Sequence, residues 1–325
     1  MSKTSRTLIA SCCLLFVFSC NQAPTEAIRI GISPWPGYEL LYLAQEKAFY
    51  RQAGLNVQIV EFSSLGDVLR AYEQGNIDGM ACTLTEVILA KQQSSRDPKI
   101  VSLLDFSNGA DAIIAYPPIS NIKGLRNKNI GVETNSLGLY ILSRALELND
   151  MTLNDVRIIP LTPANQELAF NKKEIDAAVI YPPVLNRLMR NAKAKILFSS
   201  ADIPQEVIDM LVFDAEILKT REQEIAKILN VWDQTMLYAK QNSAESHKIM
   251  AAKELITPKE FHESLKGLEF LPLAEQVDLF RNDTLVKNNI DKMYEFLVYT
   301  KQIEVDTKAN NLIDPSIINS LLETH

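Results

Sequence analysis

Cysteine is scarce in this sequence, with only four in 325 residues. Cys12 and Cys13 lie in an apolar segment at the N-terminus, so a chain that loses this segment keeps only Cys20 and Cys82. If Cys20 is modified, Cys82 has no partner left, which excludes a fold held together by disulfides. The fold must therefore rest on its hydrophobic core, and about 300 residues can build one large or two medium-sized domains.

Histidine is rarer still, and no catalytic motif stands out. The sequence contains three histidines, all in its C-terminal part: His247, His262 and His325. No histidine is therefore expected at the ends of strands as a general base or metal ligand. The GxSxG, Walker and GxGxxG motifs are absent, and Cys82 without a nearby histidine is better explained as a buried apolar residue than as a nucleophile. We therefore expect no catalytic residue, no metal and no cofactor.

Basic residues are not in excess either. The chain has 33 lysines and arginines against 40 acidic residues, a net charge of −7 and a pI of about 5.2. Without a basic stripe to contact a phosphate backbone, nucleic acid is not an expected partner. After the N-terminal segment, no apolar run approaches the roughly 20 residues of a transmembrane helix.

The first residues have the features of a secretion signal. Two basic residues precede the apolar run Leu8–Phe18, which is too short to cross a bilayer. The run ends in Ser19-Cys20, which resembles the bacterial lipobox, where a small residue precedes the cysteine that becomes lipidated. We predict a signal peptide over residues 1–19, a lipidated tether over 20–27 anchored through Cys20, and an exported protein on the periplasmic side of a membrane. An ordinary signal peptide with a chance cysteine is the alternative.

From residue 28 onward the hydrophobic pattern alternates between strand and helix. Strands are predicted at Ile28–Ile32, Asn56–Phe62 and Ile77–Cys82, and helices at Glu39–Arg51 and Leu65–Tyr72. Strands that alternate with helices of this length are typical of a parallel α/β sheet.

A second α/β unit begins near Pro117-Pro118 and ends near residue 212. A strand at Asp209–Phe213 is predicted to return to the first unit, and the chain after Thr220 is predicted to be helical, over 221–241, 243–254, 258–266 and 284–301.

This order of elements predicts an α/β protein shaped as a two-lobed clamp with a helical C-terminal tail. Lobe 1 would comprise residues 28–116 plus 213–325, and lobe 2 would comprise 117–212. The crossings near 117 and 212 would form the hinge, and a ligand would bind between the lobes. Two independent tandem domains are the alternative.

Six short stretches support one family in combination: Gly31–Tyr38, Gly75–Asp78, Leu84–Glu86, Asp105–Ala112, Ile130–Glu133 and Asp176–Pro182. Together they resemble the nitrate/sulfonate/taurine/thiamine-precursor family of periplasmic binding proteins. The resemblance implies the type II periplasmic-binding fold, a small-molecule ligand, and delivery of that ligand to the permease and ATPase subunits of an ABC importer. One departure concerns the ligand, because the family often has aromatic-Glu-Pro where this chain has Tyr181-Pro182-Pro183.

The predicted ligand-binding residues lie where strands end and helices begin. Trp35 and Tyr38 sit on a loop rich in proline and glycine, where their rings can stack on a flat or cationic ligand. Asp111 opens an apolar strand, where an acid must be solvated, paired or used. Packing at the lobe edge for Trp35 and plain helix capping for the hydroxyl and amide residues are the alternatives. The full set is Ser33, Trp35, Tyr38, Thr83, Thr85, Glu86, Asp111, Asn135, Ser136 and Tyr181.

The chemistry of this set favours a cationic ligand. It holds two acids and several aromatic rings but no arginine or lysine, so a site for nitrate or a sulfonate would depend on helix N-termini against the charges of Glu86 and Asp111. We predict a small organic solute with an amine or a nitrogen heterocycle, stacked on Trp35 and bound to Asp111. A ligand-sensing partner of a membrane receptor, or an enzyme related to those that make the thiamine pyrimidine, are the alternative functions.

Overall fold

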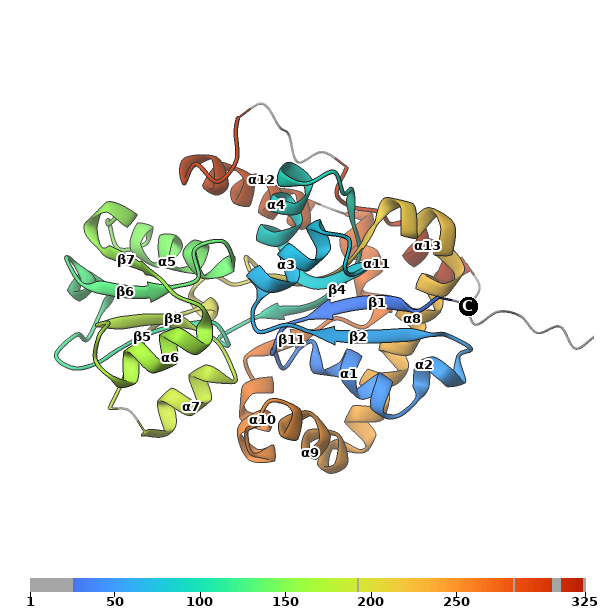
Figure 1. Cartoon of the computed structure of the whole chain (residues 1–325), viewed down its shortest axis with the longest axis horizontal. Coiled ribbons are helices and arrows are strands. Elements are labelled where there is room, and N and C mark those ends of the chain that lie inside the picture. Colours follow the sequence, from blue (N-terminus) through green and yellow to red (C-terminus); the bar gives the residue numbers. More distant parts are fainter. Residues whose placement is uncertain (1–25, 192, 283, 306–310, 324–325) are drawn as a thin grey trace, which may run out of the picture.

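The computed structural model of the chain describes residues 26–191, 193–282, 284–305 and 311–323. Figure 1 shows two lobes side by side, each built around its own β-sheet. The predicted signal peptide and Cys20 lie outside the described residues.

The sheet of lobe 1 has six strands in the order β11-β4-β10-β3-β1-β2. β1 runs parallel to β2 and β3, whereas β10 runs antiparallel to both β3 and β4. The central strands are buried along their whole length because helices cover both faces of the sheet, which explains their continuous apolar sequences. The strands are β1 (Ile28–Ile32), β2 (Val57–Glu61), β3 (Gly79–Thr83), β4 (Pro98–Ser107), β10 (Ile208–Asp214) and β11 (Leu268–Phe270).

The sheet of lobe 2 has five strands in the order β7-β6-β8-β5-β9. β6 runs parallel to β7 and β8, and β5 runs antiparallel to β8 and β9. The strands are β5 (Ala112–Ala115), β6 (Asn129–Val132), β7 (Arg157–Pro160), β8 (Ala177–Ile180) and β9 (Lys195–Ser199).

The chain crosses between the lobes twice, over residues 108–111 between β4 and β5 and over 200–207 between β9 and β10. The predicted return of the strand at 209–213 is confirmed, because β10 pairs with β3 and β4 of lobe 1. The predicted hinge positions near 117 and 212 are wrong, because neither lies at a crossing between the lobes. Pro117-Pro118 follows β5 inside lobe 2, and Val212 lies within a strand of lobe 1. The two prolines end a strand and do not mark the lobe boundary.

Helices cover both faces of each sheet. The single helix predicted over 39–51 is two helices, because Ala48 adopts a left-handed conformation with φ of 59° and interrupts it. The helices of lobe 1 are α1 (Glu39–Glu46), α2 (Phe49–Gln52), α3 (Leu65–Glu73) and α4 (Leu84–Gln93). Those of lobe 2 are α5 (Leu137–Glu147), α6 (Pro163–Asn171) and α7 (Val184–Asn191), with short 3₁₀ turns at Ile122–Leu125, Leu153–Asp155 and Ser200–Asp202.

The C-terminal tail packs on lobe 1 and confirms the predicted helical character, with one strand that the sequence pattern did not reveal. β11 adds to the edge of the first sheet beside β4. None of the helices in the described ranges is long and apolar enough to cross a membrane. The tail helices are α8 (Ala215–Gln241), α9 (Ser243–Lys253), α10 (Pro258–Leu265), α11 (Leu273–Arg281), α12 (Thr284–Tyr299) and α13 (Ser316–Glu323).

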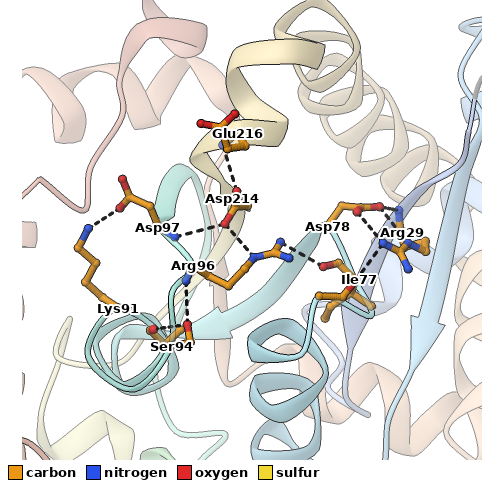
Figure 2. A network of polar contacts seen from close by, with 11 residues as sticks. Arg29, Ile77, Asp78, Lys91, Ser94, Arg96, Asp97, Asp214 and Glu216 are labelled. Atoms are coloured by element: carbon orange, nitrogen blue, oxygen red, sulfur yellow. Dashed lines mark hydrogen bonds and ion pairs between the residues drawn. The ribbon is translucent and has the colours of Figure 1, made fainter.

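A polar network fastens lobe 1 at the amino ends of its parallel strands (Figure 2). Asp214 ends β10, caps α8 by accepting from the backbone N–H of Glu216 at 3.0 Å, and forms an ion pair of 2.8 Å with Arg96. Arg29 of β1 pairs with Asp78, just before β3, at 2.8 Å. These groups stabilise the end of the sheet where β1 and β3 begin. The opposite end, where the parallel strands have their carboxyl ends, is the place where ligands bind in sheets of this kind.

Candidate ligand-binding site

A small cavity lies between the two lobes at the carboxyl ends of β1 and β3. Its volume is about 20 Å³, which is room for about one water molecule. Both lobes and one crossing segment contribute to its wall, which is formed by Ser33, Trp35, Tyr38, Leu65, Thr83, Asp111, Leu137, Gly138, Tyr181 and Asp209. The lobes are therefore closed on one another in this structure.

Aromatic rings from both lobes meet at this cavity. Trp35 of lobe 1 contacts Tyr181 of lobe 2 edge-on, with ring centroids 5.9 Å apart, and lies 6.4 Å from Tyr38. The indole N–H of Trp35 and the hydroxyl of Tyr181 are buried without a hydrogen-bond partner among the described residues. Buried donors of this kind are costly unless something satisfies them, so they are suited to contact a ligand.

Two aspartates on neighbouring strands lie at the site: Asp209 lines the cavity, and Asp105 lies beside it behind the cavity wall. Asp105 of β4 and Asp209 of β10 are paired in register, and the hydroxyl of Tyr38 donates a short hydrogen bond to Asp209. Burial raises the pKa of Asp105 to about 8. Burial, and then the charge of Asp105, raise the pKa of Asp209 well above its usual range. Two carboxyl groups this close and this dry cannot both ionise readily, so they hold a proton at neutral pH.

The approach of Asp105 to the aromatic loop depends on a glycine. A Cβ atom at Gly37 would collide with the Asp105 carboxylate and the Trp35 indole. The indole N–H and Asp209 lie close enough to lower the pKa of Asp105 in part. Within the described chain, however, neither oxygen of Asp105 has a well-formed hydrogen bond. The carboxyl group is therefore buried behind Trp35 with unused acceptor capacity.

Asp111 lies on the first crossing between the lobes and also faces the cavity. It is 5% exposed, and its backbone N–H donates to Ser107 at 3.3 Å. Burial raises the pKa of Asp111 to about 6, so its carboxyl group is largely ionised at neutral pH. One of its oxygens has no hydrogen-bond partner in the part of the chain that the structure describes. Asp111 is thus the acid of the cavity most ready to meet a cation.

Glu86 fastens the closed lobes together. One carboxylate oxygen accepts from the backbone and hydroxyl of Thr83 at 3.0 and 2.6 Å, which caps α4. The other accepts from the hydroxyl of Ser136, in lobe 2, at 2.7 Å. In a second hydrogen bond between the lobes the acceptor lies in lobe 2: Glu133 accepts from the backbone N–H of Gly66, in lobe 1, at 3.3 Å. Both acids therefore make contacts that only a closed clamp allows.

Six of the ten predicted ligand-binding residues line the cavity, and four do not. Thr85 and Asn135 lie outside it, Thr85 with its hydroxyl bonded to the sulfur of Met293 at 3.3 Å, and Asn135 exposed. Glu86 and Ser136 engage each other, as described above. Ligand roles for these four stay predictions that the geometry does not support. The six lining residues are Ser33, Trp35, Tyr38, Thr83, Asp111 and Tyr181.

Asp105 and Asp209 lie at the site but are not among the predicted ligand-binding residues. Each is a charged residue inside an otherwise apolar buried strand, Leu-Leu-Asp-Phe in β4 and Ile-Asp-Met-Leu in β10. This signal was available in the sequence, because an acid in such a strand must be paired, protonated or used.

The wall of the cavity offers few kinds of binding group. Among the described residues, no lysine or arginine lines the cavity, and no cluster of three metal-ligating side chains occurs. Burial raises the pKa of the Cys82 thiol, which keeps it protonated and a poor nucleophile. Aromatic faces, hydroxyl groups, buried acids and the N-termini of α1, α3, α4 and α5 remain as the binding groups. Of these four termini, that of α5 alone has no acidic residue in its first turn.

Related proteins of known description match most of the chain. Residues 35–246 match the NMT1/THI5-like family. A candidate aliphatic sulfonates-binding protein of Bacillus subtilis (strain 168) is 26% identical over 306 residues, which cover 92% of this chain and 89% of that protein. The taurine-binding periplasmic protein of Escherichia coli (strain K12) is 26% identical over 182 residues, 55% of this chain and 56% of that protein.

Solved structures share the fold. The alkanesulfonate-binding protein SsuA from Xanthomonas axonopodis pv. citri, bound to MOPS, has a TM-score of 0.75 at 17% identity and covers 89% of this chain and 98% of its own. The desulfurization enzyme DszB, in a complex with biphenyl-2-sulfinic acid, has a TM-score of 0.64 at 12% identity over 91% and 99%. At such identities the likeness shows the fold alone, and that fold serves binding proteins and an enzyme. The protein therefore belongs to the NMT1/THI5-like family and has the periplasmic-binding-protein fold.

Proposed function

We propose that this protein is an exported solute-binding lipoprotein that captures a small organic cation and delivers it to the permease and ATPase of an ABC importer. The relatives described as binding proteins support capture and delivery without chemistry on the solute. The observation that carries the ligand class is the cavity between the lobes, where buried acids meet aromatic rings and where no lysine or arginine of the described residues contributes.

The balance of charge in the cavity favours a cation over a sulfonate. The first turns of α1, α3 and α4 each contain an acidic residue, which leaves the N-terminus of α5 to offer roughly half a positive charge. This positive charge is opposed by Asp111, and by the pair Asp105 and Asp209, which gains a negative charge when a cation displaces a proton from it. The faces of Trp35 and Tyr181 add attraction for an ammonium group or a flat cationic ring. An amine or a nitrogen heterocycle uses the acids and the ring faces, whereas a sulfonate would have to bind at the helix N-termini against these acids.

Ligand entry requires the lobes to part. A cavity of about 20 Å³ admits no organic solute while Trp35 touches Tyr181. The crossings at 108–111 and 200–207 are the segments about which lobe 2 can move. Closure then restores the bridges of Glu86 and Glu133 around the bound solute.

A thermal-shift panel tests the ligand class. Organic amines, amidines and aminopyrimidines are expected to raise the melting temperature, because a ligand at a hundred times its Kd adds about 2.7 kcal/mol to the free energy of unfolding, or about 5 °C for a chain of this size. Sulfonates without an amino group, at equal concentration, are expected to produce no shift. A panel in which only sulfonates shift the transition would contradict the proposal.

The proposed anchor has its own test. Cys20 lies outside the described residues, so the proposal rests on the signal sequence before it. Three acyl chains, at about 0.8 kcal/mol per buried methylene, would hold the protein permanently on the membrane. We expect Cys20→Ala to move the protein to the soluble fraction or to leave the signal uncleaved, as seen by cell fractionation. A mature, membrane-bound variant would show that Cys20 is not the anchor.

A further inference from the structure

A second and larger cavity adjoins the first one. It has a volume of about 230 Å³, and Tyr181 belongs to the walls of both cavities. The aromatic loop separates them, because Ser33 and Trp35 face the small cavity whereas Pro34 faces the large one. The large cavity is lined by both lobes and by the end of α9, so it too belongs to the interface between the lobes.

Glu254 in the wall of this second cavity, and Glu39 buried near Glu254 but outside the wall, are carboxyl groups without hydrogen-bond partners among the described residues. Glu254, directly after α9, lines the cavity although only 4% of its surface is exposed. Glu39, in the first turn of α1 and next to Tyr38, is 1% exposed and lies close enough for the charge of Glu254 to disfavour its ionisation. None of the four carboxyl oxygens has a hydrogen-bond partner among the described residues. Burying two acids in this way costs stability, which a bound cation would recover.

The two basic residues of the cavity wall form their ion pairs with other acids, although the charge of Arg187 favours ionisation of Glu254 in part and that of Lys253 favours ionisation of Glu39. Lys253 forms its ion pair with Glu61. Arg187 forms a two-pronged ion pair with Glu167, at 2.8 to 3.1 Å. Lys253 and its partner Glu61 both belong to the cavity wall, whereas Arg187 belongs to it and its partner Glu167 does not. Glu254 has no ion-pair partner among the described residues, and burial raises its pKa to about 8, so a cation bound there would displace its proton.

We propose that this cavity is a second cationic subsite of the same cleft, so that the captured solute is an elongated organic dication. One ammonium or amidinium group would lie at Asp111 and Asp209, the connecting part along the ring of Tyr181, and the second cationic group at Glu254 with Glu39. The inference rests on the proposed function, because the first group must be a cation for the second subsite to complete a dication. The acids of each subsite can bind one positively charged group. Only a ligand with two such groups occupies both subsites at once.

Linear diamines test the subsite, from diaminopropane to diaminooctane, each compared by calorimetry with the monoamine of equal chain length. We expect one diamine length to bind at least about tenfold more tightly than its monoamine, since a charge-assisted hydrogen bond contributes this much or more. Glu254→Gln is expected to remove that advantage, and Glu39→Gln to reduce it. Glu263→Gln removes a charge from an exposed residue that pairs with Lys266, and as the control it is expected to change neither affinity.

The outcomes separate the two proposals. If diamines and monoamines bind equally to the wild type, the second subsite is wrong and the cation-binding cleft stands. Melting curves first show that Glu254→Gln and Glu39→Gln are folded. If the preferred diamine then binds both variants as tightly as it binds the wild type, its second charge lies elsewhere and the second subsite is wrong. If no amine of either kind binds, the proposed ligand class fails and the subsite fails with it.

Discussion

Replacing Asp111 by asparagine is expected to weaken the binding of a cationic solute by about ten- to a hundredfold. The change removes the one acid of the cavity whose pKa, about 6, leaves it largely ionised at neutral pH. A charge-assisted hydrogen bond contributes about 1.5–3 kcal/mol, and each 1.4 kcal/mol corresponds to a factor of ten in Kd. The size of the side chain is kept, so the loss reports charge and not shape.

The melting temperature of the free protein distinguishes a binding role from a structural one. Because one Asp111 oxygen has no hydrogen-bond partner in the described part of the chain, Asp111→Asn is expected to leave the melting temperature unchanged or slightly raised. Asp97→Asn is the control for affinity, because it removes the same charge from a half-exposed residue that pairs with Lys91 in the network of Figure 2, at the end of the sheet away from the cavity. Its affinity for the solute is expected to equal that of the wild type. Affinities that stay equal in wild type and Asp111→Asn would contradict the role given to this acid.

Stability and affinity are expected to change with pH in opposite directions. Burial raises the pKa of Asp105 to about 8, whereas in the unfolded chain it is near 4. The folded protein therefore binds more protons than the unfolded chain between these values, and the free energy of unfolding falls as pH rises through this window. At about 1.4 kcal/mol per pKa unit, the loss amounts to several kcal/mol.

Asp105→Asn isolates this effect. The variant cannot ionise at this position, so its melting temperature is expected to fall less steeply between about pH 5 and about pH 8 than that of the wild type. Asp209 and Asp111, which face Asp105, have pKa values raised in the same direction and leave part of the slope in place. Equal slopes for the two proteins, measured by calorimetric melting, would show that Asp105 does not carry the raised pKa.

The affinity for a cationic solute is expected to change with pH in the opposite direction to the stability of the free protein. Such a solute favours the ionised form of Asp105, Asp111 and Asp209, so its affinity is expected to rise with pH over the window in which the free protein loses stability. A structural acid cluster without a ligand role would show the first trend and not the second.

Much of the architecture could be predicted from the sequence, because local patterns determine it. Strand and helix periods predicted both α/β units, and the strand pattern at 209–213 predicted the strand that returns to lobe 1. The lobe boundary was misplaced because Pro117-Pro118 is a strong local signal that happens to lie after β5. The crossings at 108–111 and 200–207 are defined by which strands pair, which is a long-range property.

The site was predictable only where a residue type is informative by itself. Trp35 and Tyr181 stand out on loops, and Asp111 stands out at the start of an apolar strand. The pair Asp105 and Asp209 forms only through the register of β4 with β10, which no local pattern contains. Glu86 was predicted as a ligand contact, but the same carboxylate is suited to cap α4 and to accept from Ser136, and the packing of the lobes decides between these uses.

The number of protons exchanged on binding tests most directly whether the acidic cleft binds a cation. Isothermal titration calorimetry near pH 7, in two buffers of different ionisation enthalpy, measures the number of protons exchanged when a solute from the thermal-shift panel binds. A cation displaces the proton held by Asp105 and Asp209, so we expect proton release, reduced in Asp105→Asn. An anion would leave those carboxyl groups protonated, so binding of the preferred solute without proton release, or with proton uptake, would contradict cation binding.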